Sequence, residues 1–241
     1  MRAETRHQLK QDKFSRATIG AAEATVHWSV EHKSKLVLGG LILAVVLAAA
    51  FGGWYYLNQQ DQKASVQLNQ AVRTLDTQLR PAGTPAEPDI PSFTSAKERT
   101  TEAHKQFQAI VNQYPHTRTA EFAHYFLGLT SYQLGDNAAA ERDLRSVAST
   151  HNEDLAALAK LALAGVYRDT NRTKDAIDLY NQLIAKPTRS VGKTTAQMEL
   201  AEMYVSTQQP AEAKRIYEQI QKENPASEVA QFATQKLQAL K

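Results

Sequence analysis

The chain has 241 residues, enough for one or two domains, and 42% of them are hydrophobic, which excludes wholesale disorder. It contains no cysteine, so disulfides, thiolate metal sites and a cysteine nucleophile are excluded. Lys and Arg number 28 against 25 Asp and Glu, and this net charge of +3 would suit nucleic-acid binding if the excess lay on a folded domain. Whether nucleic-acid binding is expected therefore depends on where along the chain the excess positive charge lies.

The first feature along the chain is an uncharged run from Leu36 to Leu57. Its 22 residues would extend about 33 Å as a helix, which is enough to cross a bilayer. A buried core helix of this length would show a polar face, which the run lacks. A cleaved signal peptide would have a shorter apolar core and a shorter preceding segment. Residues 36–57, which end in the interfacial aromatics Trp54, Tyr55 and Tyr56, are therefore predicted to be an uncleaved transmembrane helix.

The charges on the two sides of this span predict its orientation. Residues 1–35 carry seven basic and four acidic side chains, whereas residues 58–241 carry 21 of each. The positive-inside rule then places segment 1–35 in the cytoplasm and the rest of the chain across the membrane. Because the whole positive excess precedes the span, it is a topology signal, and no nucleic-acid partner is expected.

Small residues recur at every fourth position within the span and would form a packing face for another helix, including a second copy of the span in a homodimer. They are Gly40, Ala44, Ala48 and Gly52. The alternative is that Gly and Ala are simply common in membrane helices.

Residues 58–80 are predicted to form a helix, because apolar residues recur among polar ones without an internal Gly or Pro. Pro81 ends this pattern. Residues 81–95 contain four of the eight prolines and are predicted to be an irregular linker.

From residue 96 to residue 241 the sequence repeats. Four alanines recur at spacings of 37, 36 and 37 residues: Ala103, Ala140, Ala176 and Ala213. Each is followed by a bulky residue four positions later and by an aliphatic residue seven positions later. That pattern is one helical face. A leading helix precedes each of the three later alanines, marked by Leu127-Gly128, Leu163-Ala164 and Leu200-Ala201. The last helix, Ser227 to Leu240, is expected to cap the stack with Val229, Phe232, Leu237 and Leu240 facing it.

This array of helix pairs resembles the tetratricopeptide repeat. The resemblance implies an all-α fold in which a tetratricopeptide-like α-solenoid of about three and a half helix pairs follows the transmembrane helix. Three departures are plain: the period exceeds the usual ~34 residues, no Trp opens a unit, and the linker stands where the first unit's leading helix belongs. Whether the helix of residues 58–80 folds back to fill that place is left open.

Stacked helix pairs curve into a groove lined by the leading helices, and such grooves bind peptide segments. Aromatic, Arg and Met side chains are the usual anchors of binding surfaces. The candidate groove contacts of that kind are Phe122, Tyr125, Tyr132, Arg168 and Met198. The alternative is that several of them belong to the core between units.

No catalytic, metal-binding or cofactor-binding residue is predicted. Gly192-Lys193-Thr194 lacks the first glycine of a phosphate loop and is expected to be an interhelical loop. The carboxylate pairs Glu141/Asp143 and Glu153/Asp154 are expected to lie on solvated faces.

The short basic N-terminus, the span ending in Gly53-Trp54-Tyr55-Tyr56 and the repeat domain together resemble the ancillary SecYEG translocon subunit family. The resemblance implies a single-span protein of the bacterial inner membrane with a periplasmic repeat domain. It also implies three kinds of protein partner: translocon subunits, a membrane-anchored prolyl isomerase chaperone and exported clients. Two alternatives stay open. One is a structural scaffold for cell-envelope assembly, in division, polysaccharide export or outer-membrane biogenesis, and the other is an enzyme, for which the sequence offers no motif.

Overall fold

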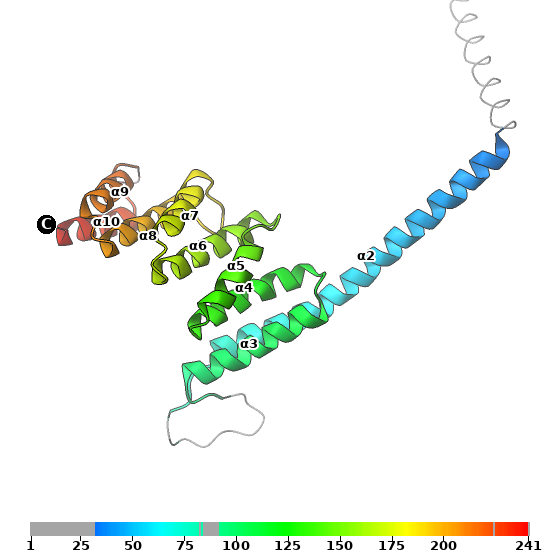
Figure 1. Ribbon diagram of the computed structural model, residues 1–241, viewed down its shortest axis with the longest axis horizontal. Helices are drawn as coiled ribbons and strands as arrows, with labels where there is room; N and C mark the ends of the chain where they lie inside the picture. Colours follow the sequence, from blue (N-terminus) through cyan, green and yellow to red (C-terminus); the bar gives the residue numbers. More distant parts are fainter. Residues whose placement is uncertain (1–31, 82, 84–91, 224, 241) are drawn as a thin grey trace, which may run out of the picture. The chain divides into compact units, whose positions relative to one another are not determined.

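The computed structural model describes residues 32–81, 83, 92–223 and 225–240. All the named elements in these ranges are α-helices, so the predicted all-α class is confirmed (Figure 1). In chain order they are α2 (Lys33–Asp76), α3 (Ala96–Gln113), α4 (Arg118–Gln133), α5 (Asn137–Val147), α6 (Glu153–Asp169), α7 (Thr173–Ala185), α8 (Lys193–Ser206), α9 (Pro210–Glu223) and α10 (Glu228–Ala239). The chain divides into two compact units, Met1–Tyr56 and Leu57–Lys241.

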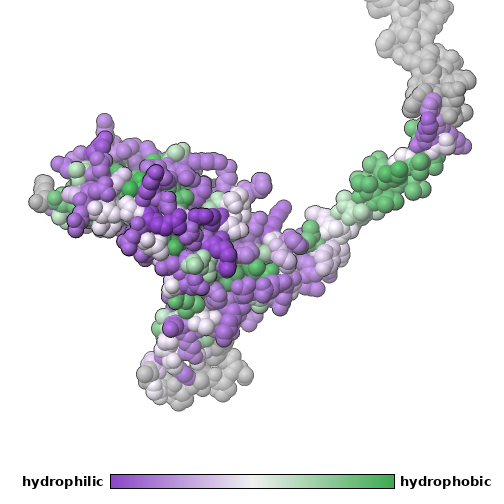
Figure 2. All heavy atoms as spheres, in the orientation of Figure 1, coloured by the Kyte–Doolittle hydropathy of each residue, from purple (hydrophilic) through white to green (hydrophobic). Residues whose placement is uncertain are grey.

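In the first unit, α2 is long and apolar enough to cross a membrane by length and composition. Its most apolar window has a mean hydropathy of 2.5, and none of that window is buried against other parts of the protein. The hydrophobic residues of this part of α2 stand out in Figure 2, whereas the visible face of the repeat region is largely hydrophilic. Nothing lies within 4 Å of a Cβ built on Gly40 or Gly52, so the predicted small-residue face is uncovered here. The residues before His32, which include most of the predicted cytoplasmic segment, lie outside the described ranges.

Helix α2 does not break at residue 57 and ends at Asp76, whereas the sequence pattern placed the end at Arg80. The earlier end has a tertiary cause. The backbone N–H of Arg80 donates to the Phe93 carbonyl oxygen at 2.8 Å, and Leu79 and Phe93 form an isolated β-bridge. Arg99 of α3 donates from Nη1 to the carbonyl oxygen of Thr77 at 2.8 Å. These contacts supply hydrogen-bond partners for backbone groups beyond the end of α2. They also join the two ends of the linker.

From Leu57 onward, α2 is the leading helix of the first pair. Ala64 and Ala71 are fully buried in a cluster with Phe107 of α3 and other apolar side chains of α3 and α4. Thr74 donates from Oγ1 to Gln106 Oε1 on α3 at 2.9 Å. The sequence left open how the missing first leading helix is replaced, and this packing supplies the answer.

The predicted face of small, bulky and aliphatic residues is confirmed on α3, α5, α7 and α9. Its four alanines, from Ala103 to Ala213, have no exposed surface. The bulky and aliphatic members of the face are at most 2% exposed, and they are Phe107, Leu144, Tyr180, Tyr217, Ile110, Val147, Leu183 and Ile220. Consecutive helices pack on one another from α3 to α10. The periodic face therefore builds the core of the solenoid.

The terminal helix α10 caps the stack as expected, but only two of the four residues predicted to face it do so. Ala230 and Ala233 are buried against α9, and the predicted Leu237 and Leu240 pack beside them. Val229 is 37% exposed and Phe232 is 44% exposed, so the prediction that both face the stack is wrong. The small alanines allow α10 to approach α9 closely, and this turns the two bulkier residues toward solvent.

Candidate interaction face on the leading helices

The leading helices of the later pairs are α4, α6 and α8, and α4 and α6 contact each other directly. Two of them begin at a capping side chain. Thr117 Oγ1 accepts from the N–H of Ala120 at 3.1 Å, and Asn152 Oδ1 accepts from the N–H of Leu155 at 3.2 Å. Because one side of each leading helix packs on the helix that follows it, another side is left for contacts with neighbouring leading helices and solvent. We call this side the leading-helix face, and the five candidate groove residues define it: Phe122, Tyr125, Tyr132, Arg168 and Met198.

The five candidates are exposed to different degrees. Phe122 is 38% exposed, the most open of the five. Tyr125 and Tyr132 are half-buried and pack against the core cluster of α5, α6 and α7. Met198 is half-buried against the cluster around Ala201. The leading-helix face thus combines the exposed ring of Phe122 with half-buried side chains that also pack against the core. The alternative interpretation of the sequence expected such core packing for several of the five candidates.

Polar side chains connect the leading helices in series. Tyr132 of α4 donates its hydroxyl hydrogen to Asp169 Oδ2 on α6. Arg168 donates from Nε to Asp169 Oδ1 at 3.2 Å, and its Nη1 lies 3.7 Å from Glu199 Oε2 on α8. Lys236 of α10 then donates from Nζ to Glu202 Oε1 on α8 at 3.0 Å. Of the five candidates, the structure brings Tyr132 and Arg168 together, through Asp169.

The candidate list lacked Asp169, Glu199 and Lys236. A signal for one of them was present, because Tyr132 and Asp169 are 37 residues apart, one more than the 36 residues that separate Gly128 from Ala164 on the same two helices. Residues one period apart occupy equivalent positions on adjacent leading helices, so a search for polar pairs within one residue of that spacing would have found this contact. Spacing alone does not reveal the partners of Arg168 and Glu202, since those contacts depend on side-chain length.

Burial and these polar contacts shift the pKa values of titratable side chains on the leading-helix face. The hydrogen bond from Tyr132, together with Arg168, lowers the pKa of the Asp169 carboxyl. Burial, followed by the hydrogen bond to Asp169, raises the pKa of Tyr132, and burial raises the pKa of Tyr125. Near neutral pH the face therefore carries a charged Asp169 beside two neutral tyrosines.

One predicted solvated carboxylate is buried. The side chain of Asp143 on α5 is only 8% exposed, and its Oδ1 lies 3.6 Å from His124 Nδ1 on α4. Arg142 contacts the other oxygen at 3.1 Å. Burial by itself would raise the pKa of Asp143, but the interactions with His124 and Arg142 outweigh it and lower the pKa. The solvated-face prediction is wrong for Asp143 because the carboxylate lies in the contact between α4 and α5.

Glu141, the other member of that pair, joins two repeats. Both of its carboxylate oxygens accept from Arg172 Nη1 at 2.8 Å, and Arg145 Nη2 donates to Oε1 at 2.7 Å. The Arg172 guanidinium carbon lies 4.0 Å from the centre of the Tyr167 ring. This cluster connects α5, the end of α6 and the start of α7, so Glu141 supports the stack. Asp154 also has a fixed partner, since its Oδ1 accepts from the N–H of Ser190 at 3.0 Å.

The described part of the chain contains no group of three or more His, Asp or Glu side chains that could hold a metal ion. The geometry described above instead consists of a repeated apolar core and a partly open face with side chains that join successive helices. That arrangement can bind another polypeptide by surface contact.

A family model described as tetratricopeptide repeat-like domain matches residues 26–241. The chain belongs to this tetratricopeptide repeat-like family. The match includes the apolar run as well as the repeats. The predicted resemblance to the tetratricopeptide repeat is thus confirmed at the level of the family.

A solved tetratricopeptide repeat protein from Parabacteroides merdae ATCC 43184 is similar in fold to this family member. The TM-score is 0.53 at 17% sequence identity, and the similarity covers 74% of this chain and 60% of that chain. No protein with curated annotation matches. At this identity the similarity concerns the fold alone, and it agrees with the helix pairs described above.

Proposed function

We propose that this chain is a membrane-tethered interaction module whose leading-helix face binds polypeptide segments on the extracytoplasmic side of the bacterial inner membrane. A tetratricopeptide-like fold is typical of protein–protein interaction scaffolds, and protein partners in general follow from membership of the family. The single observation that carries the proposal is the leading-helix face, where open and half-buried rings lie beside an ordered series of polar contacts.

The chemistry of the face favours polypeptide partners. Phe122 offers an exposed ring, and Tyr125 and Met198 are held by core contacts, so they lose little conformational freedom when a partner binds. Residues 58–241 carry equal numbers of acidic and basic side chains, 21 of each, which gives a polyanion no general attraction. No cofactor enters the proposal.

The membrane part of the proposal rests on residues 36–57 and on the seven basic side chains that precede them. We infer that the N-terminus is cytoplasmic, that the repeat domain is periplasmic, and that Gly40, Ala44, Ala48 and Gly52 form the packing face of the span. A C-terminal alkaline phosphatase fusion is expected to be active, because that enzyme requires export. An inactive fusion whose full-length production is verified would contradict the orientation.

The proposed partners are translocon subunits, a membrane-anchored prolyl isomerase chaperone and exported clients, and the resemblance of the whole architecture supports this choice. The test is co-purification with the detergent-solubilised protein after crosslinking in cells. We expect translocon subunits or the isomerase to be recovered with the natural chain and to be reduced at least severalfold with Phe122→Ser. The matched control is Asn181→Ser, at an exposed position on α7, and it should recover the same amounts as the natural chain.

Two outcomes would contradict this assignment. Recovery of cell-wall enzymes or polysaccharide export components in place of translocon subunits would favour the envelope-scaffold function. Equal recovery with Phe122→Ser and with the natural chain would show that the leading-helix face is not the binding surface.

A further inference from the structure

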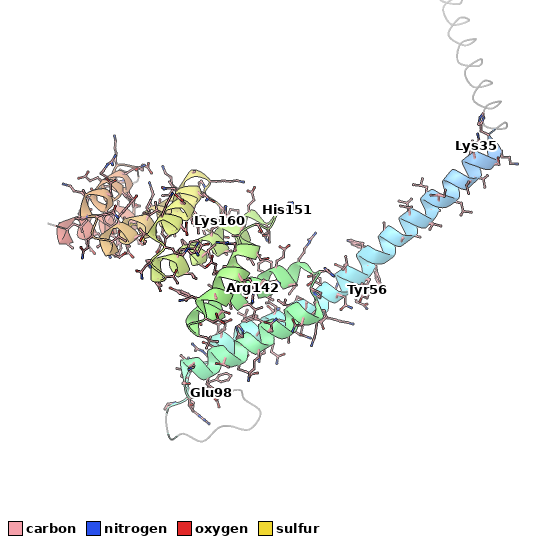
Figure 3. All side chains as sticks on the ribbon, in the orientation of Figure 1. Lys35, Tyr56, Glu98, Arg142, His151 and Lys160 are labelled. Atoms are coloured by element: carbon pink, nitrogen blue, oxygen red, sulfur yellow. The ribbon has the colours of Figure 1, made fainter. Side chains whose placement is uncertain are left out.

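The terminal helix α10 repeats the beginning of α4. The same spacing of 110 residues separates Pro115, Ala120, Phe122, Ala123 and Leu127 from Pro225, Ala230, Phe232, Ala233 and Leu237. The first turns also match, because α4 begins at a threonine cap and α10 at a serine cap, where Ser227 Oγ accepts from the N–H of Ala230 at 3.1 Å. Helix α10 is therefore a further leading helix, and it lies at the end of the solenoid opposite to α3 (Figure 3).

Phe232 occupies on α10 the position that Phe122 occupies on α4. Both rings are open, with Phe122 38% exposed and Phe232 44% exposed, and the alanine that follows each ring is fully buried. At the equivalent position α6 carries the half-buried Leu158 and α8 carries the exposed Thr195. The row of leading helices thus has an exposed ring at each end and a smaller side chain at the two positions between.

A partner helix that completed a pair with α10 would meet an obstacle. In the earlier pairs the trailing helix packs on Gly128, Ala164 or Ala201, and even a methyl group added at Gly128 would clash with it. The equivalent residue of α10 is Gln238, which is exposed and too large for such a close approach. The surface that α10 offers to a ligand is therefore its groove side.

Between the two rings, acidic side chains outnumber basic ones. The charged residues of this stretch are Asp169, Glu199 and Glu202 against Arg168 and Lys236, a net charge of −1, and their side chains are 36–47% exposed. Lys236 is paired with Glu202 at 3.0 Å and lies 5.0 Å from the centre of the Phe232 ring, so this charged stretch borders the second ring. Because both cations already have carboxylate partners, the remaining negative charge favours a basic residue in the ligand.

The spacing of the helices limits the length of the ligand. Contacts from Tyr132 to Asp169, from Arg168 to Glu199 and from Lys236 to Glu202 connect the leading helices one after another. The axes of packed helices lie about 8–10 Å apart, so the three steps from α4 to α10 extend over about 24–30 Å. An extended chain rises about 3.4 Å per residue and would cover that length with about eight residues.

The polar middle of the row favours an extended ligand over a helical one. A bound helix would place a continuous apolar stripe against Thr195 and the charged side chains. An extended segment instead presents free backbone N–H and C=O groups, which carboxylates such as Glu199 and the guanidinium of Arg168 can bind.

The following step rests on the proposed function and specifies its ligand. We propose that Phe232 is a second anchor of the leading-helix face, and that the face binds an internal, extended segment with two bulky apolar side chains about eight residues apart and a basic residue between them. One apolar side chain contacts Phe122, the other contacts Phe232, and the basic residue lies against Glu199 and Glu202. A folded protein would bury both apolar side chains, so the ligand is a polypeptide that has not yet folded.

The test uses the full chain in lipid nanodiscs and fluorescein-labelled peptides of Ser and Gly with both ends blocked. The two-anchor peptide has two Leu residues about eight positions apart and one Lys midway between them. In the one-anchor peptide the second Leu is replaced by Ser. Fluorescence anisotropy should give the two-anchor peptide an affinity about tenfold higher, because a second leucine is buried.

Variants of α10 assign the second anchor. Phe232→Ser should lower the affinity for the two-anchor peptide to that for the one-anchor peptide, and it should change the affinity for the one-anchor peptide little, because Phe122 still binds its leucine. Phe232→Leu keeps an apolar side chain and should retain most of the difference. Gln231→Ser, at the exposed neighbouring residue of α10, is the matched control and should behave as the natural chain.

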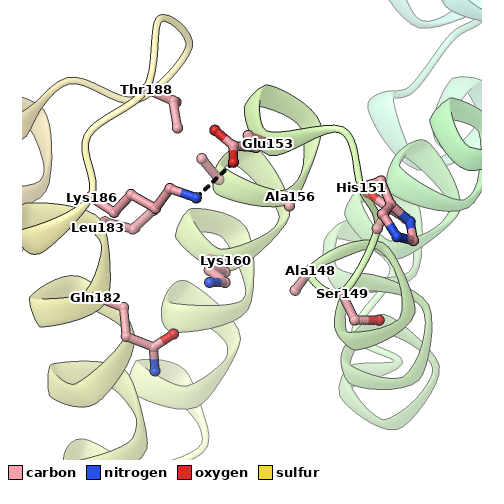
Figure 4. Close-up of a pocket in the computed structure, with 12 residues that line it drawn as sticks. Ala148, Ser149, His151, Glu153, Ala156, Lys160, Gln182, Leu183, Lys186 and Thr188 are labelled. Atoms are coloured by element: carbon pink, nitrogen blue, oxygen red, sulfur yellow. Dashed lines mark hydrogen bonds and ion pairs between the residues drawn. The ribbon is translucent and has the colours of Figure 1, made fainter.

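A second control tests another hollow of the repeat region. Gln182 lines a recess of about 300 Å³ between α5, α6 and α7 (Figure 4). Gln182→Trp should leave the binding of both peptides unchanged, provided that circular dichroism shows the natural helix content for this and every other variant. Loss of binding in Gln182→Trp would place the peptide in that recess and overturn the proposal.

Phe122→Ser separates the two levels of the argument. If it weakens binding of the two-anchor peptide whereas Phe232→Ser does not, the proposed function stands and the second anchor is refuted. If neither substitution changes binding, the leading-helix face itself is refuted as the binding surface. Equal affinity for a peptide with the leucines about four positions apart, or with Glu in place of Lys, would overturn the proposed ligand.

Discussion

Gly128 shows how closely successive helices of this solenoid approach one another. A Cβ at this position of α4 would lie 2.5 Å from Cγ and 2.8 Å from Cδ2 of Leu144 on α5. The equivalent residues of the next two leading helices are Ala164 and Ala201, and they face Tyr180 and Tyr217 in place of leucine. The first of these three pairs therefore has the least space, and only glycine fits there without a shift of Leu144 or of the backbone.

We expect Gly128→Ala to destabilise the repeat domain by about 1–3 kcal/mol, because the added methyl group overpacks the contact with Leu144. The matched control is Gly165→Ala on α6, where the nearest atom to an added Cβ is Tyr132 Oη at 4.0 Å. Alanine favours a helix over glycine by up to about 1 kcal/mol, so the control should be neutral or stabilising. Urea unfolding measures both. An equal effect of the two substitutions would show that the α4–α5 contact is looser than described.

The turns between the two helices of each of the three later pairs contain a left-handed residue. Gly135 has φ of 86°, Asn171 of 60° and Gln208 of 59°. Glycine adopts this conformation without strain and asparagine tolerates it, but glutamine does not favour it. The Gln208 turn is therefore the most strained of the three.

Gln208→Gly should stabilise the domain by up to about 1 kcal/mol, and Asn171→Gly should have a smaller effect. Both are measured by thermal or urea unfolding. Loss of stability in Gln208→Gly would mean that its side chain makes contacts that outweigh the backbone strain.

Among the helices, α2 was the hardest to assign from sequence. The four repeated alanines predicted α3, α5, α7 and α9 correctly, because a buried small residue at a fixed period is a local pattern. The role of α2 depends on Ala64 and Ala71 meeting Phe107 across the linker of residues 81–95, which does not repeat, so no periodic spacing encodes that contact. The exposure of Phe232 was not predicted for the same reason, because it depends on a tertiary contact. Two buried alanines bring α10 close to α9, and this turns the Phe232 ring toward solvent.

The candidate site was predictable to a similar extent. The repeat register predicted which helices line the groove, but it did not predict that Asp169 connects Tyr132 with Arg168. It could not show that Asp143 is buried, because a carboxylate beside Arg142 looks solvated until α4 brings His124 to within 3.6 Å.

The contacts between helices predict how stability depends on pH. Asp143, Glu141 and Asp169 all have carboxyl pKa values lowered in the folded chain. A lowered folded pKa contributes stability above the pKa in the unfolded chain, about 4, and this contribution is lost as pH falls through the folded value. The free energy of unfolding should therefore decrease as the pH falls from about 5 toward 2.

Asp143→Asn tests this dependence. At pH 7 the variant should be less stable than the natural chain by about 1–3 kcal/mol, because the charged hydrogen-bond partner of Arg142, which also lies 3.6 Å from His124, is lost, and its stability should change less on acidification. Asp178→Asn, at an exposed position of α7, should follow the natural curve. A variant curve parallel to the natural one between pH 5 and 2 would contradict the role of Asp143.

Across the whole molecule, charge and hydropathy divide the chain into parts of different composition. The excess of positive charge precedes residues 36–57, and the residues after the span carry balanced charge. Helix α2 contains the apolar run and also supplies the first leading helix of the solenoid from Leu57 onward. Family membership from residue 26 to residue 241 includes both parts, which favours a tethered repeat domain as the functional form.

Photo-crosslinking in living cells tests whether the leading-helix face is where partners bind. A photoreactive phenylalanine analogue placed at Phe122 should form adducts with other polypeptides, because this ring is 38% exposed on that face. The same analogue at the exposed Asn181 of α7 should form few adducts. If adducts from position 122 include translocon subunits, the prolyl isomerase or exported clients, and those from position 181 do not, the proposed function is supported. Adducts that are equally abundant at both positions, or absent from position 122, would contradict it.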